Sequence, residues 1–413
     1  MVLKISSLKL LESDPALRIE ISKKLENFML QRLTKSTKKI AKALKIREVS
    51  LRRKLLGRTG YSFKLTELLV LTKKADITKK ELFSNINKVK IGSNSYWVEL
   101  LKYIKIDQEF VEGVGYYIGD GRMKTDRGLS TRNTNVETLN FFTKWLKKYF
   151  SALKTEIRVE VLLPRTIFDT AAEKNKWSKL LNLSITSVKT KHKHEEWHKE
   201  MVEVGYFRKI TKRLLDKLIP IVKKRCLNQK DLAMAYIKGI MIAEGCVKHN
   251  EKRGTRAIHL KMKDKNEVKY VFNLLRFIGL EPSFLFSRQD NEWVVTITSY
   301  DELKRLNDLK IFKFHSDRKN KLKEALKGYK HYQVKKGTVN FFYLSKLLEF
   351  EKDSGTHFTV NNLLDYINKD KNRILVVLKE LQKNGFIVGE RMIQTGRPFR
   401  FALTEKGKEF ISK

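Results

Sequence analysis

Cysteine, acidic residues and long apolar runs are all scarce in this 413-residue chain. Its two cysteines, Cys226 and Cys246, are too few for a disulfide framework or a zinc cluster. Cys246 is interpreted as a packing residue rather than a nucleophile. No charge-free apolar run approaches the roughly 18 residues that a membrane span needs. We therefore expect a soluble, cytoplasmic protein without membrane association.

Basic residues greatly outnumber the scarce acids. The chain has 87 Lys and Arg against 46 Asp and Glu, a formal net charge of +41. Lys-rich surfaces also occur in proteins from thermophiles, but these usually balance Lys with Glu, and this chain does not. So large an excess of positive charge favours a polyanionic partner, and binding to DNA would be steeply salt-dependent. We expect a nucleic-acid-binding, nucleoid-associated protein.

Two segments share one unusual pattern: GVGYYIGDG at 113–121 and IKGIMIAEG at 237–245. Each is an apolar helix that ends in a carboxylate followed by glycine. Small residues recur four apart in both, which predicts a face on which two helix backbones pack closely. These stripes are Val111, Gly115 and Gly119 in the first copy, and Ala235, Gly239 and Ala243 in the second. Such a contact would bring Asp120 and Glu244 together at the shared helix ends.

Two carboxylates forced close repel each other unless a divalent cation lies between them. Mg²⁺ held by carboxylate oxygens is the usual solution in phosphate chemistry, and Mn²⁺ can replace it. We expect Asp120 and Glu244 to be catalytic metal ligands within roughly 4–8 Å of each other, the range that one or two shared cations bridge. The backbone carbonyls of Gly119 and Ala243 would complete the metal shells. The pair predicts a metal-dependent phosphodiester-cleaving centre.

The two nonapeptides resemble the paired motifs of a single-chain, two-repeat LAGLIDADG homing endonuclease, closest in style to archaeal members. The third-position glycine, the acid at the eighth position and the final glycine are kept in both copies. The departures lie at the front, where Gly113-Val114 and Ile237-Lys238 replace Leu-Ala. The resemblance implies a monomer that acts as a pseudo-dimer on double-stranded DNA.

The segments after the two motifs support an internal repeat. Strand-like stretches at 128–133 and 255–263 are each followed by a helix start, at the capping box 134–137 and at the cap 264–267. The fold class is therefore α+β, a pseudo-symmetric pair of αββαββα repeats between two DNA-binding modules. The expected domains are 1–83 (helix-turn-helix), 84–107 (linker), 108–225 (first repeat), 226–334 (second repeat) and 335–413 (winged helix).

Cleavage also needs groups that orient water and stabilise developing charge. Lys248 follows Glu244 by four residues, and Lys310 lies in the string LNDLK, where related enzymes often keep a lysine. Arg132 and Asn133 end the first post-motif strand. Each of these is also a plausible phosphate contact for affinity alone. Strand residues of both repeats are expected to face DNA, including Arg132, Asn133, Lys261 and Lys263.

The N-terminal part has helix-turn-helix spacing: STKKIAKAL at 36–44, a turn, and EVSLRRKLL at 48–56. It resembles the Cro/repressor type, whose second helix enters the major groove. Arg47, Ser50 and Arg53 are the candidate DNA contacts, whereas Val49, Leu51 and Leu55 are interpreted as packing residues. A three-helix bundle that does not contact DNA is the alternative.

The C-terminal part reads as a winged helix. Helices are expected from 358 to 367 and from Asp370 to Leu381, followed by a hairpin of 386–392 and 399–403. The string GRPFRFALTEKG resembles the wing of bacterial and archaeal regulators. Arg391, Arg397 and Arg400 are the candidate wing contacts, although such a hairpin tip can also be merely solvated.

Two functions remain open. The first is a site-specific, Mg²⁺-dependent DNA endonuclease (a hydrolase), and the second is a non-cleaving transcriptional regulator built on the same scaffold. The flanking DNA-binding modules favour the regulator, and the survival of both acids favours the enzyme. RNA maturase activity is a less favoured third option. An intein origin is disfavoured because the chain starts at Met1 and lacks a terminal His-Asn.

Overall fold

A computed structural model describes residues 3–56, 62–92, 95–164, 166–167, 169–192, 200–250, 255–327, 338–355, 357–367, 371–390 and 400–412. The chain divides into two compact units. The first comprises 1–246, 259–297 and 305–319, and the second comprises 247–258, 298–304 and 320–413. Within the described ranges, every helix is too short or too polar to span a bilayer.

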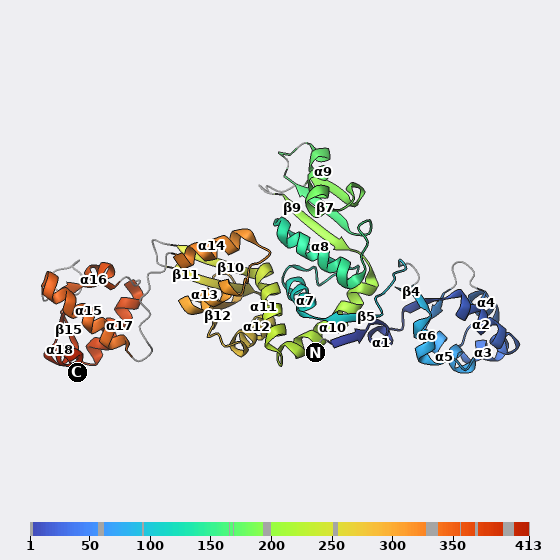
Figure 1. Cartoon of the computed structure of the whole chain (residues 1–413), viewed down its shortest axis with the longest axis horizontal. Coiled ribbons are helices and arrows are strands. Elements are labelled where there is room, and N and C mark those ends of the chain that lie inside the picture. Colours follow the sequence, from blue (N-terminus) through green and yellow to red (C-terminus); the bar gives the residue numbers. More distant parts are fainter. Residues whose placement is uncertain are drawn as a thin grey trace. The chain divides into compact units, whose positions relative to one another are not determined.

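The N-terminal region mixes short helices with two small antiparallel sheets, ordered β3-β2-β4 and β1-β5 (Figure 1). Its elements are β1 (Leu3–Ser6), α1 (Ser7–Leu11), β2 (Leu17–Ile21), α2 (Lys23–Leu33), α3 (Thr37–Ala43), α4 (Glu48–Leu55), β3 (Phe63–Lys64), α5 (Leu65–Lys74), α6 (Lys79–Ser84), β4 (Ile86–Ile91) and β5 (Tyr103–Ile106). Helices α3 and α4 occupy the segments expected to be helical, with Lys45 at φ 53° in the turn. Leu51 and Leu55 are buried as expected, but the packing role for Val49 is wrong because 58% of its surface is exposed.

The segment expected to be a linker, 84–107, contains two strands. β4 pairs with β2 and β5 pairs with β1. The cause is a period of two in the apolar residues: Val89 and Ile91 are buried on β4, as are Ile104 and Ile106 on β5. Intervening lysines raise the overall polarity of the segment and obscure this alternation in the sequence.

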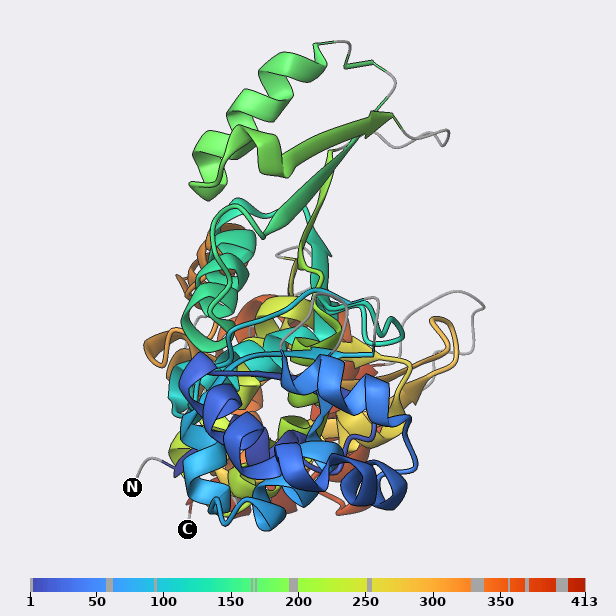
Figure 2. The same ribbon diagram turned by 90° about the vertical axis from the view of Figure 1, so that its right-hand side faces the viewer.

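The first repeat is a four-stranded sheet, ordered β6-β9-β7-β8, with helices. It contains α7 (Gln108–Asp120), β6 (Leu129–Asn133), α8 (Val136–Phe150), β7 (Arg158–Leu163), α9 (Thr170–Leu181), β8 (Val188–His192), β9 (Met201–Tyr206) and α10 (Lys209–Cys226). Two features depart from the expected αββαββα order. The first strand is reduced to a bridge between Gly121 and Thr131, and α9 with β8 is inserted, β8 running parallel to β7 (Figure 2).

The second repeat follows the expected element order. It contains α11 (Lys230–Glu244), β10 (Gly245–Asn250), β11 (Thr255–Met262), α12 (Lys265–Phe277), β12 (Ser283–Ser287), β13 (Glu292–Ile297), α13 (Tyr300–Asp308) and α14 (Ser316–Lys327). Its strand order, β10-β11-β13-β12, matches the first repeat once β6, β9 and β7 are set against β11, β13 and β12. Asp264 caps α12 as predicted, accepting hydrogen bonds from the N–H groups of Asn266 and Glu267.

The C-terminal region has its own apolar core, which includes Leu344, Leu363 and Leu378. Its elements are α15 (Val339–Ser354), β14 (Phe358–Thr359), α16 (Val360–Ile367), α17 (Lys371–Lys383), β15 (Ile387–Glu390), β16 (Arg400–Leu403) and α18 (Glu405–Ser412), with the sheet ordered β14-β16-β15. Gly385 ends α17 at φ 74°. Asp370, Arg391 and Arg397 lie outside the described residues.

Candidate active site

The two motif helices, α7 and α11, pack backbone against backbone (Figure 1). A Cβ added to Gly115 would lie 2.4 Å from the carbonyl oxygen of Tyr236, and one added to Gly239 would lie 1.9 Å from that of Glu112. At Gly119 it would lie 2.4 Å from the Cβ of Ala243. No side chain fits at these distances, so the predicted role of the small-residue stripes in close helix packing is confirmed.

Both motif helices end in the same way. Gly121 caps α7 and Gly245 caps α11, each with extended backbone, and their N–H groups donate to the carbonyls of Tyr117 and Met241. A Cβ on Gly121 would lie 2.2 Å from the Tyr117 oxygen, and one on Gly245 would lie 2.4 Å from the Met241 oxygen. The final glycine of each motif is therefore required by close backbone approach, and it leaves the acid as the last helical residue.

Asp120 is held by two residues of β6, the strand that follows its helix in the first repeat. Its Oδ2 accepts a hydrogen bond of 2.8 Å from Nδ2 of Asn133, and its backbone oxygen accepts one of 3.2 Å from Thr131 Oγ1. Burial raises the pKa of Asp120 to about 6, although the Asn133 hydrogen bond and the charge of Arg318 act in the opposite direction. The sequence placed the candidate residue Asn133 only at the end of the first strand after the motif. In the structure, its side chain contacts the carboxylate of Asp120.

Glu244 experiences the charge of Asp120. Burial raises the pKa of Glu244 to about 7, the negative charge of Asp120 raises it further, and the charge of Arg318 lowers it. The two carboxylates therefore lie close enough to repel each other in a poorly solvated place. Such a pair gains most from a bound cation.

The donor set fits a magnesium-type ion. Among the described residues there is no group of three or more His, Cys, Asp or Glu side chains that could hold a metal. Mg²⁺ is commonly bound through only one or two carboxylates, with water and substrate phosphate as its remaining ligands. Asp120 and Glu244 provide this arrangement. The oxygen of Ala243 accepts two hydrogen bonds from Arg318, at 3.2 Å each, so this carbonyl already serves a guanidinium.

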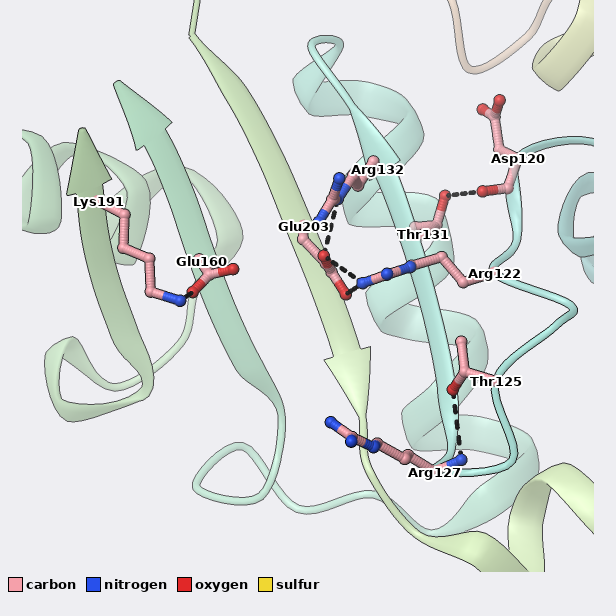
Figure 3. A network of polar contacts seen from close by, with 9 residues as sticks. All are labelled: Asp120, Arg122, Thr125, Arg127, Thr131, Arg132, Glu160, Lys191 and Glu203. Atoms are coloured by element: carbon pink, nitrogen blue, oxygen red, sulfur yellow. Dashed lines mark hydrogen bonds and ion pairs between the residues drawn. The ribbon is translucent and has the colours of Figure 1, made fainter. Parts of the chain in front are cut away.

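A polar network covers one face of the first repeat's sheet (Figure 3). Glu203 on β9 accepts hydrogen bonds from Arg132 Nε (2.8 Å) and from Arg122 Nη1 (2.9 and 3.0 Å). On the neighbouring strands, Lys191 of β8 forms an ion pair with Glu160 of β7. Buried Glu203 fixes the orientation of both arginines and leaves the trio with net positive charge. This face offers oriented cations to an external polyanion.

The other candidate side chains are described separately. Lys310 is exposed at φ 55°, where α13 has ended, so its position also has a local structural explanation. Lys248 and Lys263 are exposed, and Lys261 forms an ion pair with Asp290. Among the terminal candidates, Arg47, Arg53 and Arg400 are exposed and Ser50 is half-buried.

Sequence reasoning missed two residues near the carboxylates. Arg318 lies 74 positions after Glu244 in a basic helix that carries no motif. Tyr116 is fully buried within the first motif, and its hydroxyl is 2.8 Å from Thr131 Oγ1. The charge of Asp120 adds to burial in raising the pKa of Tyr116. The tyrosine position could have been suspected from helical spacing four residues before Asp120, whereas the sequence held no signal for Arg318.

A further half-buried acid, Glu112 on α7, predicts an unusual pH dependence. Burial raises the pKa of Glu112 to about 7, and its Oε1 has no hydrogen-bond partner. Because the folded protein retains this proton to higher pH than the unfolded chain, stability contributed by Glu112 is complete below its ordinary pKa and is lost as pH rises towards 7. We expect the metal-free protein to lose stability between pH 5 and 8. Glu112→Gln should reduce this loss by about 1–3 kcal/mol in urea unfolding; an unchanged pH profile would contradict the assignment.

Comparisons with known proteins agree with the motif-based resemblance for part of the chain. Residues 231–309 match the family model of a LAGLIDADG-like domain. No curated protein matches the chain. Solved structures that match include a mesophilic variant of the homing endonuclease I-DmoI, with 14% identity and a TM-score of 0.30 over 50% of this chain and 96% of that one. Full-length DUF199/WhiA from Thermatoga maritima matches with 12% identity and a TM-score of 0.34 over 68% of this chain and 92% of that one. I-DmoI in complex with DNA and Mn also matches, with 17% identity and a TM-score of 0.26 over 50% of this chain and 98% of that one. At these TM-scores nothing further follows from the structural matches. Over its second repeat, the chain is therefore similar to LAGLIDADG-like domains.

Proposed function

We propose that this chain is a site-specific DNA endonuclease that depends on a divalent metal, Mg²⁺ or Mn²⁺. One observation carries the proposal: Asp120 and Glu244 end two helices whose backbones touch, and the charge of Asp120 acts on Glu244. Carboxylates that are partly withdrawn from water are costly to keep charged unless they are compensated. Their presence at both helix ends is explained by a cation that they hold against a DNA phosphate.

The chain's own residues have distinct roles in this mechanism. Asp120 and Glu244 would hold the metal, whose charge would polarise the scissile phosphate and lower the pKa of an attacking water. Asn133 orients the Asp120 carboxylate through its side-chain amide. Lys248 and Lys310 remain candidates for stabilising developing negative charge, and the Gly119 carbonyl remains a candidate ligand. Ala243 leaves this ligand set because Arg318 occupies its oxygen.

Binding to DNA would use the sheet faces and the terminal modules. Arg122 and Arg132 are oriented by Glu203; Lys261 belongs to β11, the corresponding strand of the second repeat, and Lys263 follows the end of that strand. In the N-terminal module, Arg47 is the N-cap of α4, Ser50 lies in its first turn and Arg53 in its last, so all three belong to the helix proposed as the Cro/repressor-like recognition helix. The helices and strands described within 339–412 support the proposal of a C-terminal winged helix, in which exposed Arg400 at the start of β16 is a candidate DNA contact. Arg391 and Arg397, outside the described residues, remain candidates from the sequence alone.

A direct test is incubation of the whole protein with Mg²⁺ and a supercoiled library of genomic DNA. We expect double-strand cuts at one long, asymmetric site, because the two repeats differ in their strand residues. Sequencing of the DNA ends identifies the site. If a bound high-affinity site stays intact for hours with Mg²⁺ or Mn²⁺ at the working temperature, the endonuclease proposal is wrong.

The terminal modules predict a change in salt dependence. Removal of 335–413, whose core is self-contained, should weaken DNA binding about ten- to hundredfold and lower the slope of log K against log salt by about two to four. Arg47→Gln with Arg53→Gln is the better N-terminal test, because a deletion would remove the strand partners of β4 and β5. Unchanged slopes at matched salt would mean that these modules serve another partner.

A non-cleaving transcriptional regulator is the second candidate. The specific observation in its favour is Arg318, whose positive charge acts on both carboxylates without any metal. A protein that only binds DNA could retain the acids as partners of this arginine. The two candidates differ in one measurable property, since only the endonuclease needs Asp120 and Glu244 for a reaction.

A further inference from the structure

Arg318 lies at the C-terminal end of the second motif helix. Its Nη1 donates to the carbonyl oxygens of Met241 (3.1 Å), Ile242 (2.5 Å) and Ala243 (3.2 Å), and its Nη2 also donates to Ala243 (3.2 Å). The last carbonyls of a helix lack intrahelical partners and carry the negative end of the helix dipole. The planar guanidinium therefore satisfies the end of α11 immediately before Glu244.

The charge of the same guanidinium reaches both carboxylates, although the guanidinium forms a direct ion pair with neither of them. Its charge acts on Asp120 and on Glu244, and theirs act on it. Three sources of negative potential thus converge on one cation: two acids on different repeats and one helix end. The described residues offer Glu244 no other nearby cation that acts on it.

Arg318 is fixed in place by contacts with the first repeat. The ring of Phe314 stacks on Phe141 of α8 with centroids 4.6 Å apart. Thr138 Oγ1 donates to the Phe314 carbonyl (2.9 Å), and the Ser316 N–H donates to Glu137 Oε2 (2.8 Å). A segment of the second repeat, around the start of α14, is therefore fastened to a helix of the first repeat, which determines where Arg318 can reach.

We propose that Arg318 is a built-in counter-cation of the motif carboxylates, a positioning residue that holds Asp120 and Glu244 together without metal and weakens the affinity of their site for a divalent ion. Its effect on metal rests on the proposed function, whereas its effect on the metal-free carboxylates does not. The chemistry is simple charge compensation: removal of Arg318 leaves two repelling acids and a more negative site.

A double-mutant cycle tests the metal-free part in the whole protein with chelator present. Arg318→Gln should lower the folding equilibrium constant about thirtyfold in the wild type but only about threefold beside Glu244→Gln, because the carboxylate no longer needs a partner. Arg318→Lys in the wild-type background should have a folding equilibrium constant between those of the wild type and Arg318→Gln, since lysine keeps the charge but loses most of the hydrogen-bond donors. If Arg318→Gln lowers the folding equilibrium constant equally with Glu244 and with Glu244→Gln, Arg318 acts only as a cap of α11 and the proposal is overturned.

Titration with Mn²⁺ tests the metal part by calorimetry and by the metal-induced rise in Tm. Arg318→Gln should bind Mn²⁺ about tenfold more tightly than the wild type, because a repelling charge is gone. The matched control is Arg305→Gln: Arg305 donates to the carbonyls of Ile278 and Gly279 at the end of α12. This control should lose stability without any change in Mn²⁺ affinity.

The outcomes separate the two proposals. Coupling between Arg318 and Glu244 in the cycle, together with tighter Mn²⁺ binding by Arg318→Gln, supports both the counter-cation and the metal-dependent endonuclease. Coupling with no Mn²⁺ binding by the wild type or by Arg318→Gln supports the counter-cation and counts against the endonuclease. Weaker Mn²⁺ binding by Arg318→Gln would mean that the arginine assists the metal, which overturns the inference about affinity.

Discussion

Asp120→Asn and Glu244→Gln should each abolish DNA cleavage while leaving DNA binding intact. Each substitution keeps the shape of the side chain but removes one negative charge from the proposed metal site. Loss of several kcal/mol of charge stabilisation in the transition state corresponds to a rate decrease of about a thousandfold or more. Single-turnover cleavage of the bound site, with Mg²⁺ in excess, is the measurement.

DNA binding is the internal control for this result. A carboxylate near a phosphate repels it when no metal is bound, so affinity in chelator should hold or rise slightly in both variants. Arg122→Gln is a matched substitution on the sheet face, where Arg122 pairs with Glu203; it should weaken binding and retain cutting at saturating protein. If the Asp120 and Glu244 variants cut as fast as the wild type, the acids are only structural and the regulator is the better assignment.

Gly239→Ala should cause a large loss of stability. A methyl group there would lie 1.9 Å from the Glu112 carbonyl oxygen, and a backbone atom in a packed helix cannot rotate away. Alanine normally stabilises a helix by up to about 1 kcal/mol relative to glycine, so the sign of the effect is diagnostic. We expect a loss of about 3 kcal/mol or more in urea unfolding. A stabilised variant would show that α7 and α11 are not in backbone contact.

A second glycine allows a rescue. The added methyl at Gly119 would meet the Cβ of Ala243 at 2.4 Å, which is a side-chain atom and can be deleted. Gly119→Ala should therefore destabilise, and the addition of Ala243→Gly should recover part of the loss despite its own cost of about 1 kcal/mol. The same Ala243→Gly change should not rescue Gly239→Ala, whose obstacle is backbone.

The motif helices could be predicted because their signals are local. Small residues four apart define a helix face whatever else the chain does, and a carboxylate followed by glycine marks the end of each helix. The same holds for the cap at Asp264 and for α3 and α4, where side-chain chemistry within a few residues decides the conformation. Val49 was misplaced because helical periodicity alone does not say how wide the buried face is.

Strand pairing was harder to predict because it joins distant segments. β4 and β5 are strands only because β2 and β1 supply their partners, far earlier in the chain. The insertion of α9 and β8 likewise depends on the free edge of β7, to which β8 adds in parallel. The lysine-rich sequence of the stretch that holds β4 and β5 is typical of a linker. It forms strands because neighbouring strands supply hydrogen-bond partners for its backbone N–H and C=O groups.

The sequence by itself determined the two motif helices, their acids and the strongly basic character of the chain. The folding of distant segments onto one another sets the surroundings of those acids, with Asn133 on Asp120 and Arg318 at the end of α11, and it also places Glu203 between Arg122 and Arg132. The physical reason is that an ion or hydrogen-bond partner is selected by distance in space, not by separation in the chain. Arg318 reaches Glu244 because Phe314 and Ser316 anchor its segment to α8.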